Sequence, residues 1–171
     1  MSAVLVADLG GTHFRAALVD RSGATIAQSS RASTPSEADA DGRSEVAPDS
    51  WWHTLLALAA ELADRAPAAF ASVEAVALSA ITRTQVLIDA HGHPLRDAPT
   101  WRDTRATATA AELVAHLPPH HPETAQINAF HPLARLAWLK QHEPHLFSRA
   151  ATVLEPKDYL NLRLTGIRMS D

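Results

Sequence analysis

A glycine-centred hairpin near the N-terminus sets the first constraint on the fold. The segment "VLVADLGGTHFRAALVD" places two apolar runs, residues 3–7 and 15–20, on either side of two adjacent glycines and an acidic residue. Short apolar runs that are bounded by glycine indicate β-strands. A further strand candidate, "SGATIAQSS", follows a Ser-Gly turn. Three strands joined by short turns predict an antiparallel meander.

The middle of the chain predicts a loop and then an amphipathic helix. Residues 31–49 are small, polar and acidic without an apolar period, so we expect a mobile loop there. Ser50 is expected to cap a helix that Pro67 stops. The predicted buried face of this helix consists of Trp52, Leu55, Leu56, Ala59 and Leu62.

The second half of the chain alternates strand and helix signals. Residues 72–80 and 84–90 predict strands, and residues 101–117 predict a helix with Asp103 or Thr104 near its N-cap. Two further helices are expected to begin at prolines, and Gly166 should end the second. These helices start at Pro132, with Leu133, Leu136, Ala137 and Lys140 on one face, and at Pro156. This order predicts a mixed α/β sheet.

Length and composition exclude several classes of function. With 171 residues, 46% of them hydrophobic, the chain is expected to form one main domain. A net charge of -4 gives no electrostatic reason to expect nucleic acid or an anionic membrane as a partner. Cysteine is absent, and no histidines form a helical pair with the spacing of metal ligands. No signal peptide or membrane anchor is recognisable, so we expect a cytoplasmic protein.

Two common phosphate-binding loops do not fit the glycines of the hairpin. A P-loop requires Lys followed by Ser or Thr after its second glycine, and "DLGGTHFR" contains neither in that place. A dinucleotide-binding fingerprint requires a third glycine and a following helix, whereas a strand is predicted here. The hairpin therefore belongs to neither class.

The tip of the hairpin can nevertheless bind phosphate. Gly10, Gly11 and Thr12 lack bulk and can direct backbone N–H groups outward. Asp8, at the end of the first strand, would then hold Mg²⁺ directly or through water. The alternative is an ordinary turn with a solvated Asp8.

These residues and four later segments together resemble a known family. "DLGGTHFRAALVD" is similar to the first phosphate motif of the actin-like, hexokinase-like and sugar-kinase superfamily. The later segments resemble the FGGY carbohydrate kinases, and residues 99–106 and 130–166 carry the most specific part of the resemblance. The segments are "SEVAPDSWW", "VALSAITRTQVLIDAHGHPLRDAPTWRDTRA", "FHPLARLAWLKQHEPHLF" and "VLEPKDYLNLRLTG".

The resemblance implies a fold, a reaction and two cofactors. It implies a ribonuclease H-like mixed sheet of the actin-like ATPase superfamily, with flanking helices and incomplete at the C-terminus. Residues 1–171 would be part of an N-terminal sugar-binding domain, and the C-terminal nucleotide domain is expected to lie outside them. The reaction would transfer a phosphoryl group from ATP, with Mg²⁺, to a hydroxyl of a sugar, ketose or sugar acid. The full-length protein could be a homodimer.

Five residues carry the implied contacts with the sugar. Thr82 and Arg83 occupy the turn that contacts substrate hydroxyls in the family, although "AITRT" keeps neither of its usual patterns. Trp101 matches a tryptophan that walls the substrate site, and its flat face suits the C–H surface of a polyol. Asp103 can accept from sugar hydroxyls or cap a helix, and Phe130 can add an aromatic wall. A solvated Arg83 and a core tryptophan remain the alternatives.

Other polar residues in these segments are expected to have structural roles. Arg135 stands where the family usually has Lys, so its charge is kept while the compact ammonium is not. Trp138 on the same predicted helix is interpreted as core packing. Lys157 and Asp158 are interpreted as polar contacts that maintain the fold.

The catalytic base of this reaction is not recognisable in the chain. In the family, an Asp in a Gly-Gly-Asp-type motif takes the proton from the attacking hydroxyl, and we expect it beyond Asp171. Residues 1–171 alone are therefore expected to be inactive. Two other hypotheses stay open, a glucokinase-like hexose kinase and a non-catalytic sugar-binding remnant.

Overall fold

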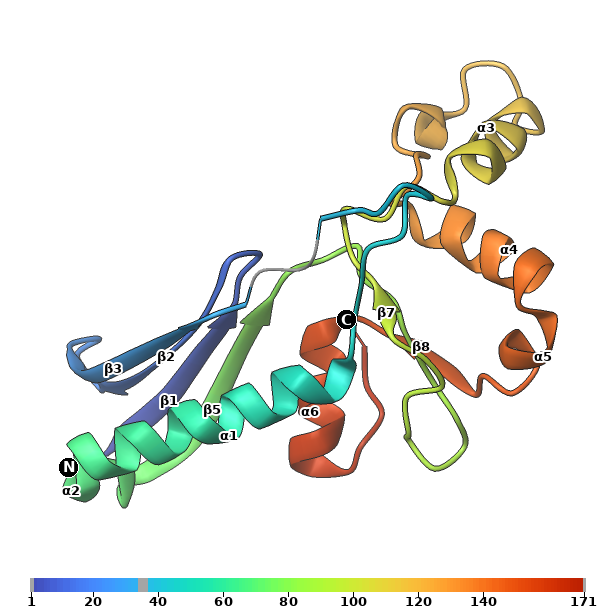
Figure 1. The fold of residues 1–171 in the computed structure, drawn as a ribbon. Helices are drawn as coiled ribbons and strands as arrows, with labels where there is room; N and C mark the ends of the chain where they lie inside the picture. The colour runs from blue at the N-terminus through green and yellow to red at the C-terminus, as the bar shows by residue number, and fades with distance from the viewer. Residues whose placement is uncertain (1, 34–36, 171) are drawn as a thin grey trace.

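A four-stranded mixed sheet forms one end of the molecule (Figure 1). The computed structural model describes residues 2–33 and 37–170. The strand order is β3-β2-β1-β5, in which β1, β2 and β3 are antiparallel and β5 is parallel to β1. The bounds are Ala3–Leu9 for β1, His13–Asp20 for β2, Thr25–Ala32 for β3 and Val73–Ala80 for β5. The predicted meander is confirmed, and β5 extends it into a mixed sheet.

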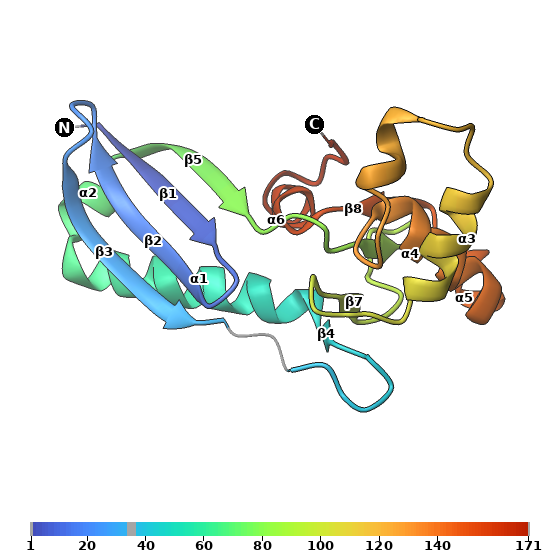
Figure 2. The ribbon, with the colours of Figure 1, turned by 90° about the horizontal axis from the view of Figure 1, so that it is seen from above.

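Helix α1, Pro48–Arg65, lies along one face of this sheet, and the short α2, Pro67–Phe70, follows it (Figures 1 and 2). The side chains of β1 alternate, so that Leu5 and Leu9 are buried in the core while Asp8 is exposed on the other side. Apolar burial between α1 and the sheet therefore builds part of the main core, to which residues 86–98 and 154–162 also contribute.

The buried stripe of α1 differs from the predicted one. Its members recur at steps of four, three and four residues, which keeps them on one helical face, and they are Trp51, Leu55, Leu58 and Leu62. Leu56 is 47% exposed, and Trp52 and Ala59 are only half-buried. The prediction was wrong at Leu56, whereas Trp52 packs against the core from its half-buried position. Neighbouring tryptophans and leucines allow two overlapping stripes, which explains the difference.

The start of α1 also corrects the prediction. The helix begins at Pro48, after Ala47, and Ala47 forms no side-chain cap. Proline suits this first position because its missing N–H would have had no partner in the helix. Ser50 is therefore inside the first turn, where its hydroxyl donates to the carbonyl of Ala47 at 2.6 Å.

The rest of the described chain forms short strands and helices, which extend from the middle of the molecule to its other end (Figure 2). Two small antiparallel pairs join distant segments: β4, Glu45–Val46, with β7, Ala98–Pro99, and β6, Val86–Ile88, with β8, Thr152–Leu154. The helices are α3, Thr107–Ala115; the 3-10 helix η1, Pro122–Ala125; α4, Pro132–His142; α5, Pro144–Phe147; and α6, Pro156–Thr165. Both strands predicted in residues 72–90 exist, but only β5 joins the large sheet.

The predicted mobile loop 31–49 is partly ordered by remote contacts. Residues 34–36 lie outside the described residues. The start of the segment completes β3, and its end forms β4 and the first residues of α1. Ser44 is buried, its carbonyl accepts from the backbone N–H of Thr100 at 2.8 Å, and its own N–H donates to the Asp103 carboxylate at 3.1 Å. These partners are far away in sequence, so local composition did not indicate them.

The helices of the second half confirm the proline signals and correct two details. Pro132 and Pro156 begin α4 and α6, and Gly166 ends α6 with φ of 73°. Helix α3 begins only at Thr107, so neither Asp103 nor Thr104 is its N-cap. The buried residues of α4 are Ala134, Arg135 and Leu139, whereas the predicted Leu133 and Lys140 are exposed and Leu136 and Ala137 are half-buried. Among the described helices, none is long and apolar enough to cross a membrane.

Candidate functional site

The hairpin between β1 and β2 closes tightly at its tip. The N–H of Gly10 donates to the carbonyl of His13 at 2.9 Å, and a Cβ atom on Gly10 would lie 3.0 Å from that oxygen. The Gly10 N–H is therefore used within the hairpin. Our expectation that it points outward was wrong. The N–H groups of Gly11 and Thr12 form no hydrogen bond to another described residue. These two amides are the donors that the tip can offer to an anion.

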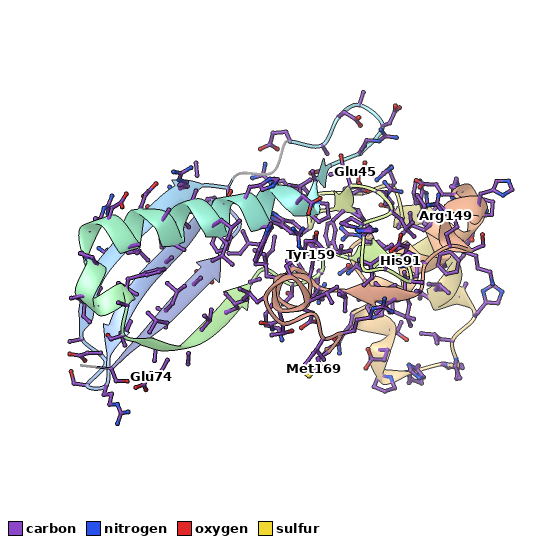
Figure 3. The ribbon with its side chains drawn as sticks, turned by 90° about the horizontal axis from the view of Figure 1, so that it is seen from below. Glu45, Glu74, His91, Arg149, Tyr159 and Met169 are labelled. Atoms are coloured by element: carbon purple, nitrogen blue, oxygen red, sulfur yellow. The ribbon has the colours of Figure 1, made fainter. Side chains whose placement is uncertain are left out.

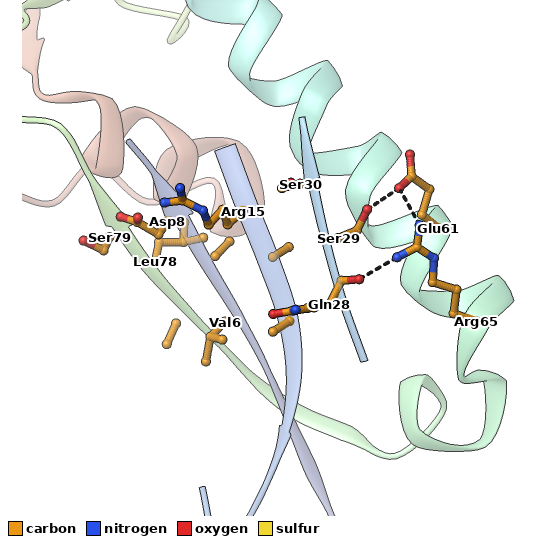
Figure 4. Close-up of a pocket in the computed structure, with 14 residues that line it drawn as sticks. Val6, Asp8, Arg15, Gln28, Ser29, Ser30, Glu61, Arg65, Leu78 and Ser79 are labelled. Atoms are coloured by element: carbon orange, nitrogen blue, oxygen red, sulfur yellow. Dashed lines mark hydrogen bonds and ion pairs between the residues drawn. The ribbon is translucent and has the colours of Figure 1, made fainter. Parts of the chain in front are cut away.

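Asp8 is exposed beside the tip and carries a free carboxylate. It lies opposite Arg15 of β2 and Ser79 of β5 in the strand register, and the three are neighbours on the surface shown in Figure 4. Within residues 2–33 and 37–170, no side chain bonds to this carboxylate. A hollow of about 780 Å³ adjoins it, lined in part by Val6, Gln28 and Ser79. The sequence analysis did not single out Arg15 or Ser79, because only the register brings them to Asp8.

A single carboxylate suits Mg²⁺ better than it suits most protein-bound metals. No group of three or more acidic, His or Cys side chains among the described residues could hold a metal ion. Mg²⁺ is usually bound by one or two carboxylates, with water and substrate phosphates as the remaining ligands. Asp8 therefore fits a magnesium ion that arrives with a nucleotide.

Trp101 lies directly against the hairpin. It is in the loop after β7, is 41% exposed, and its indole nitrogen lies 3.5 Å from the position that a Cβ atom on Gly11 would occupy. The guanidinium carbon of Arg102 lies 5.0 Å from the Trp101 ring centroid, a cation–π distance. The structure thus joins the predicted phosphate-binding tip and the predicted sugar wall at one place.

The turn that carries Thr82 and Arg83 leaves the same edge of the sheet. β1 and β5 are parallel and end side by side, and the N–H of Ile81 donates to the carbonyl of Leu9 at 2.8 Å. Arg83 has φ of 57°, and its N–H donates to the Glu155 carboxylate at 3.0 Å. Thr82 and Arg83 are both exposed. Ligands of α/β proteins commonly bind at the carboxyl ends of parallel strands, and the turn with Thr82 and Arg83 lies at such an end.

Asp103 is placed differently from the other predicted contacts. It is buried, and its carboxylate accepts from the backbone of Ser44 and from the guanidinium of Arg105, with 2.6 Å to Arg105 Nη2. These bonds occupy both carboxylate oxygens, so Asp103 ties β4 to the loop after β7. Arg105 also lies over the ring of Trp138, 4.6 Å from its centroid. A direct contact of Asp103 with sugar stays a prediction.

Phe130 and Arg135 complete this side of the site. Phe130 is half-buried just before α4, and its ring centroid lies 5.8 Å from the guanidinium carbon of Arg135. Arg135 is buried and reaches several carbonyl groups behind the site. The sequence analysis treated Arg135 only as a helix residue, because its hydrogen-bond partners lie in segments that are remote in sequence.

Two neighbouring networks have structural roles. The half-buried Arg96 lies between the carboxylates of Glu45 and Glu143, and loss of solvent around its guanidinium lowers its pKa. Asp158 is buried on α6 and pairs with Lys157 at 3.0 Å, in agreement with the fold-maintaining role expected for both. Trp138 is half-buried between Arg105 and His142, with its ring stacked on that of His142.

The sequence matches one family over almost its whole length. A sequence profile described as "FGGY family of carbohydrate kinases, N-terminal domain" matches residues 3–171. The chain is 29% identical to a xylulose kinase of Bacillus subtilis and 30% identical to one of Escherichia coli, covering 98% and 96% of this chain. It is 31% identical to an L-fuculokinase of Salmonella typhi. These alignments cover 34%, 34% and 35% of the relatives, so the chain spans about a third of their length.

Solved structures agree with the sequence matches. A xylulose kinase from Rhodospirillum rubrum superposes with a TM-score of 0.88 at 30% identity, over 99% of this chain and 36% of that one. A kinase from Brucella ovis, described as a xyloylose kinase, gives a TM-score of 0.86 at 29% identity, over 96% and 34%.

Proposed function

The chain belongs to the FGGY family of carbohydrate kinases, as part of their N-terminal domain, and from this premise we propose that it forms the sugar-binding side and part of the phosphate site of a sugar-kinase active site. Its fold is the ribonuclease H-like fold of the actin-like ATPase superfamily, as the sequence predicted. The observation that carries the proposal is the position of Trp101 next to Gly11 of the hairpin tip, beside an Asp8 carboxylate that no side chain of the described residues binds.

The hairpin would face the phosphates of ATP. Gly11 and Thr12 would donate backbone N–H groups to phosphate oxygens, and the absence of side-chain bulk at Gly10 lets the tip turn tightly. Asp8 would hold Mg²⁺ directly or through water, and the metal ion would neutralise charge on the transferring phosphoryl group. The main task of the hairpin is then to position the donor.

The sugar would lie next to the hairpin, against Trp101. The exposed indole face would pack on the C–H surface of a polyol, and the hydroxyl and guanidinium groups of Thr82 and Arg83 would bond to its hydroxyls. Phe130 would supply a second apolar surface. A pentulose is the first substrate to test because the named relatives are mostly xylulose kinases. Sugar acids are the second class of substrate to test, because the guanidinium of Arg83 can bind their carboxylate.

Residues 1–171 would bind but not complete the reaction. In-line attack requires a base that takes the proton of the sugar hydroxyl. Asp8 is assigned to Mg²⁺ and Asp103 is buried in an ion pair, so neither suits this role. The Gly-Gly-Asp-type motif that the family resemblance implies for the base does not occur in residues 1–171, so we propose that the base and the nucleotide domain lie outside them.

A coupled ADP-release assay on the complete gene product tests the proposal. Pentuloses, hexuloses, polyols and aldonic acids would be screened with ATP, with and without Mg²⁺. We expect Mg²⁺-dependent turnover of a sugar in one of these classes, and its loss in Asp8→Asn. Turnover of none of them would refute the kinase proposal. Sugar binding without turnover would favour a non-catalytic sugar-binding protein instead.

A further inference from the structure

Arg135 joins three separate segments of the proposed sugar site. The side chain is buried, with a residue exposure of 2%, and it projects from the first turn of α4. Its guanidinium donates to six acceptors, five of them backbone carbonyls. They are the carbonyls of Arg83, Pro99 at 3.0 Å, Thr100, Asp103 at 3.5 Å and Ala129 at 3.3 Å, and the side-chain oxygen of Gln85 at 3.1 Å.

The acceptors fall into three groups along the chain. One group lies in the turn 83–85 after β5, a second in the loop 99–103 that follows β7, and a third directly before α4. Each group adjoins one proposed sugar contact: Arg83, Trp101 and Phe130 respectively. The contacts themselves come from distant parts of the sequence, so a shared partner is needed to hold them in a fixed relation.

Backbone carbonyls hold this cation, and no carboxylate of the described residues forms an ion pair with it. Burial lowers the pKa of Arg135 to about 10, and the nearby Asp103 carboxylate opposes that shift. The guanidinium is therefore still charged at neutral pH. A buried cation whose hydrogen bonds go mainly to backbone is tied to loop geometry more directly than one held by flexible acidic side chains.

We propose that Arg135 is a positioning residue that sets the relative placement of the 83–85 turn, the 99–103 loop and Phe130 for sugar recognition. The expected effect on sugar binding rests on the proposed kinase function, whereas the hydrogen bonds of Arg135 do not. Arginine suits this role because its planar fork offers five N–H donors over a wide span. Lysine offers only three donors, all from one nitrogen, so it can satisfy fewer of these separated acceptors at once.

Two substitutions and one matched control test the placement in this chain. Arg135→Lys keeps the charge with fewer donors, and Arg135→Met removes both. The control is Arg96→Lys, because the Arg96 side chain is also only 9% exposed but bonds to Glu45, Glu143 and the Asp97 carbonyl rather than to the three groups. If Arg135→Met does not fold, Arg135→Lys alone decides the outcome.

The first measurement is ¹⁹F NMR of the chain labelled with 5-fluorotryptophan. The four tryptophans give four resonances, and Trp101→Phe assigns one of them. We expect both Arg135 variants to shift or broaden the Trp101 resonance while those of Trp51 and Trp52, at the start of α1, stay in place. Arg96→Lys should leave the Trp101 resonance unchanged. An unchanged Trp101 resonance in a folded Arg135 variant would overturn the proposal.

The second measurement separates positioning from general damage. In the complete gene product, Arg135→Lys should raise the KM for sugar by roughly 10- to 100-fold while kcat and the KM for ATP change by less than about 3-fold, since small misplacements of binding groups have effects of this size. An equal loss in all three constants would mean a merely structural role and would count against the inference. If the wild-type protein turns over no sugar, the proposed function fails, and the NMR result still decides whether Arg135 positions Trp101.

Discussion

The indole nitrogen of Trp101 lies 3.5 Å from the position that a Cβ atom on Gly11 would occupy, so a side chain added at the tip of the first hairpin would meet the loop after β7 at van der Waals distance. Gly11 belongs to the proposed phosphate side of the site and Trp101 to the proposed sugar side. A larger side chain at the hairpin tip should therefore displace Trp101, the proposed sugar wall.

Gly11→Val should displace Trp101, whereas Gly11→Ala should not. Alanine adds only the Cβ atom, at an ordinary contact distance from the indole. Valine adds two methyl groups with little rotamer freedom to avoid the ring. In the complete gene product, we expect Gly11→Val to raise the KM for sugar by about tenfold relative to Gly11→Ala. Equal KM values in the two variants would show that Trp101 does not depend on this contact.

Gly10→Ala should destabilise the hairpin itself. The added Cβ atom would lie 3.0 Å from the carbonyl oxygen of His13, a backbone atom that cannot rotate away. Crowding of this kind typically costs about 1–3 kcal/mol. Urea unfolding should therefore show a lower free energy of unfolding for Gly10→Ala than for Gly11→Ala, which serves as the control. Equal free energies of unfolding for the two variants would contradict the close approach of residue 10 to the His13 carbonyl.

Local signals predicted those parts of the fold that depend on neighbouring residues. The meander, the helix starts at Pro132 and Pro156, and the stop at Gly166 follow from backbone preferences of a few residues. The buried face of α1 was wrong at Leu56 because adjacent apolar residues allow two helical stripes, and only the sheet selects between them. Periodicity alone therefore predicted where the helix lies in the sequence but not which of its faces is buried.

The sequence singled out candidate residues for the site but not the contacts between them. The hairpin motif identified Asp8, and the register then supplied Arg15 and Ser79 beside it. Burial of Asp103 depends on Ser44, which local composition had placed in a mobile loop. Such long-range hydrogen bonds have no local signature in a single sequence, so the structure was needed to show them.

Asp8→Asn should remove activity without affecting stability. The Asp8 carboxylate is exposed and has no partner among the described side chains, so the free energy of unfolding should change by less than about 0.5 kcal/mol. Loss of a charged metal ligand should lower kcat by about 100-fold or more. Thermal unfolding and ADP release measure the two effects. A variant that keeps wild-type kcat would refute the assignment of Mg²⁺ to Asp8.

Trp101→Ala should weaken sugar binding more than Trp101→Phe. Trp101 is 41% exposed, so its loss removes little of the core, while stacking of an aromatic ring on an apolar surface contributes about 1 kcal/mol. We expect about a fivefold rise in the KM for sugar in the Ala variant and a smaller rise in the Phe variant. In the chain itself, sugar should quench tryptophan fluorescence weakly. A sugar response unchanged in Trp101→Phe would exclude Trp101 as the wall.

The single tyrosine of the chain should make stability fall at alkaline pH. Tyr159 is buried where α6 meets α1, and its hydroxyl donates to Asp49 at 2.7 Å (Figure 3). Burial and this hydrogen bond raise its pKa to about 12, while Arg163, which donates to the hydroxyl at 2.9 Å, opposes the shift. The folded chain therefore keeps the tyrosine proton at pH values where the unfolded chain, with a pKa near 10, has lost it.

This stabilisation is fully present below about pH 10 and is lost as the pH rises toward 12, on the order of 1–3 kcal/mol in total. Tyr159→Phe should remove this part of the pH dependence and leave that of the lysines and arginines. Because the chain has one tyrosine, tyrosinate absorbance reports the pKa of Tyr159 directly. A titration midpoint near 10 in the folded chain would contradict the buried hydrogen bond to Asp49. A midpoint near 12, together with a flatter alkaline stability curve for Tyr159→Phe, would establish it, because an exposed phenol gives neither result.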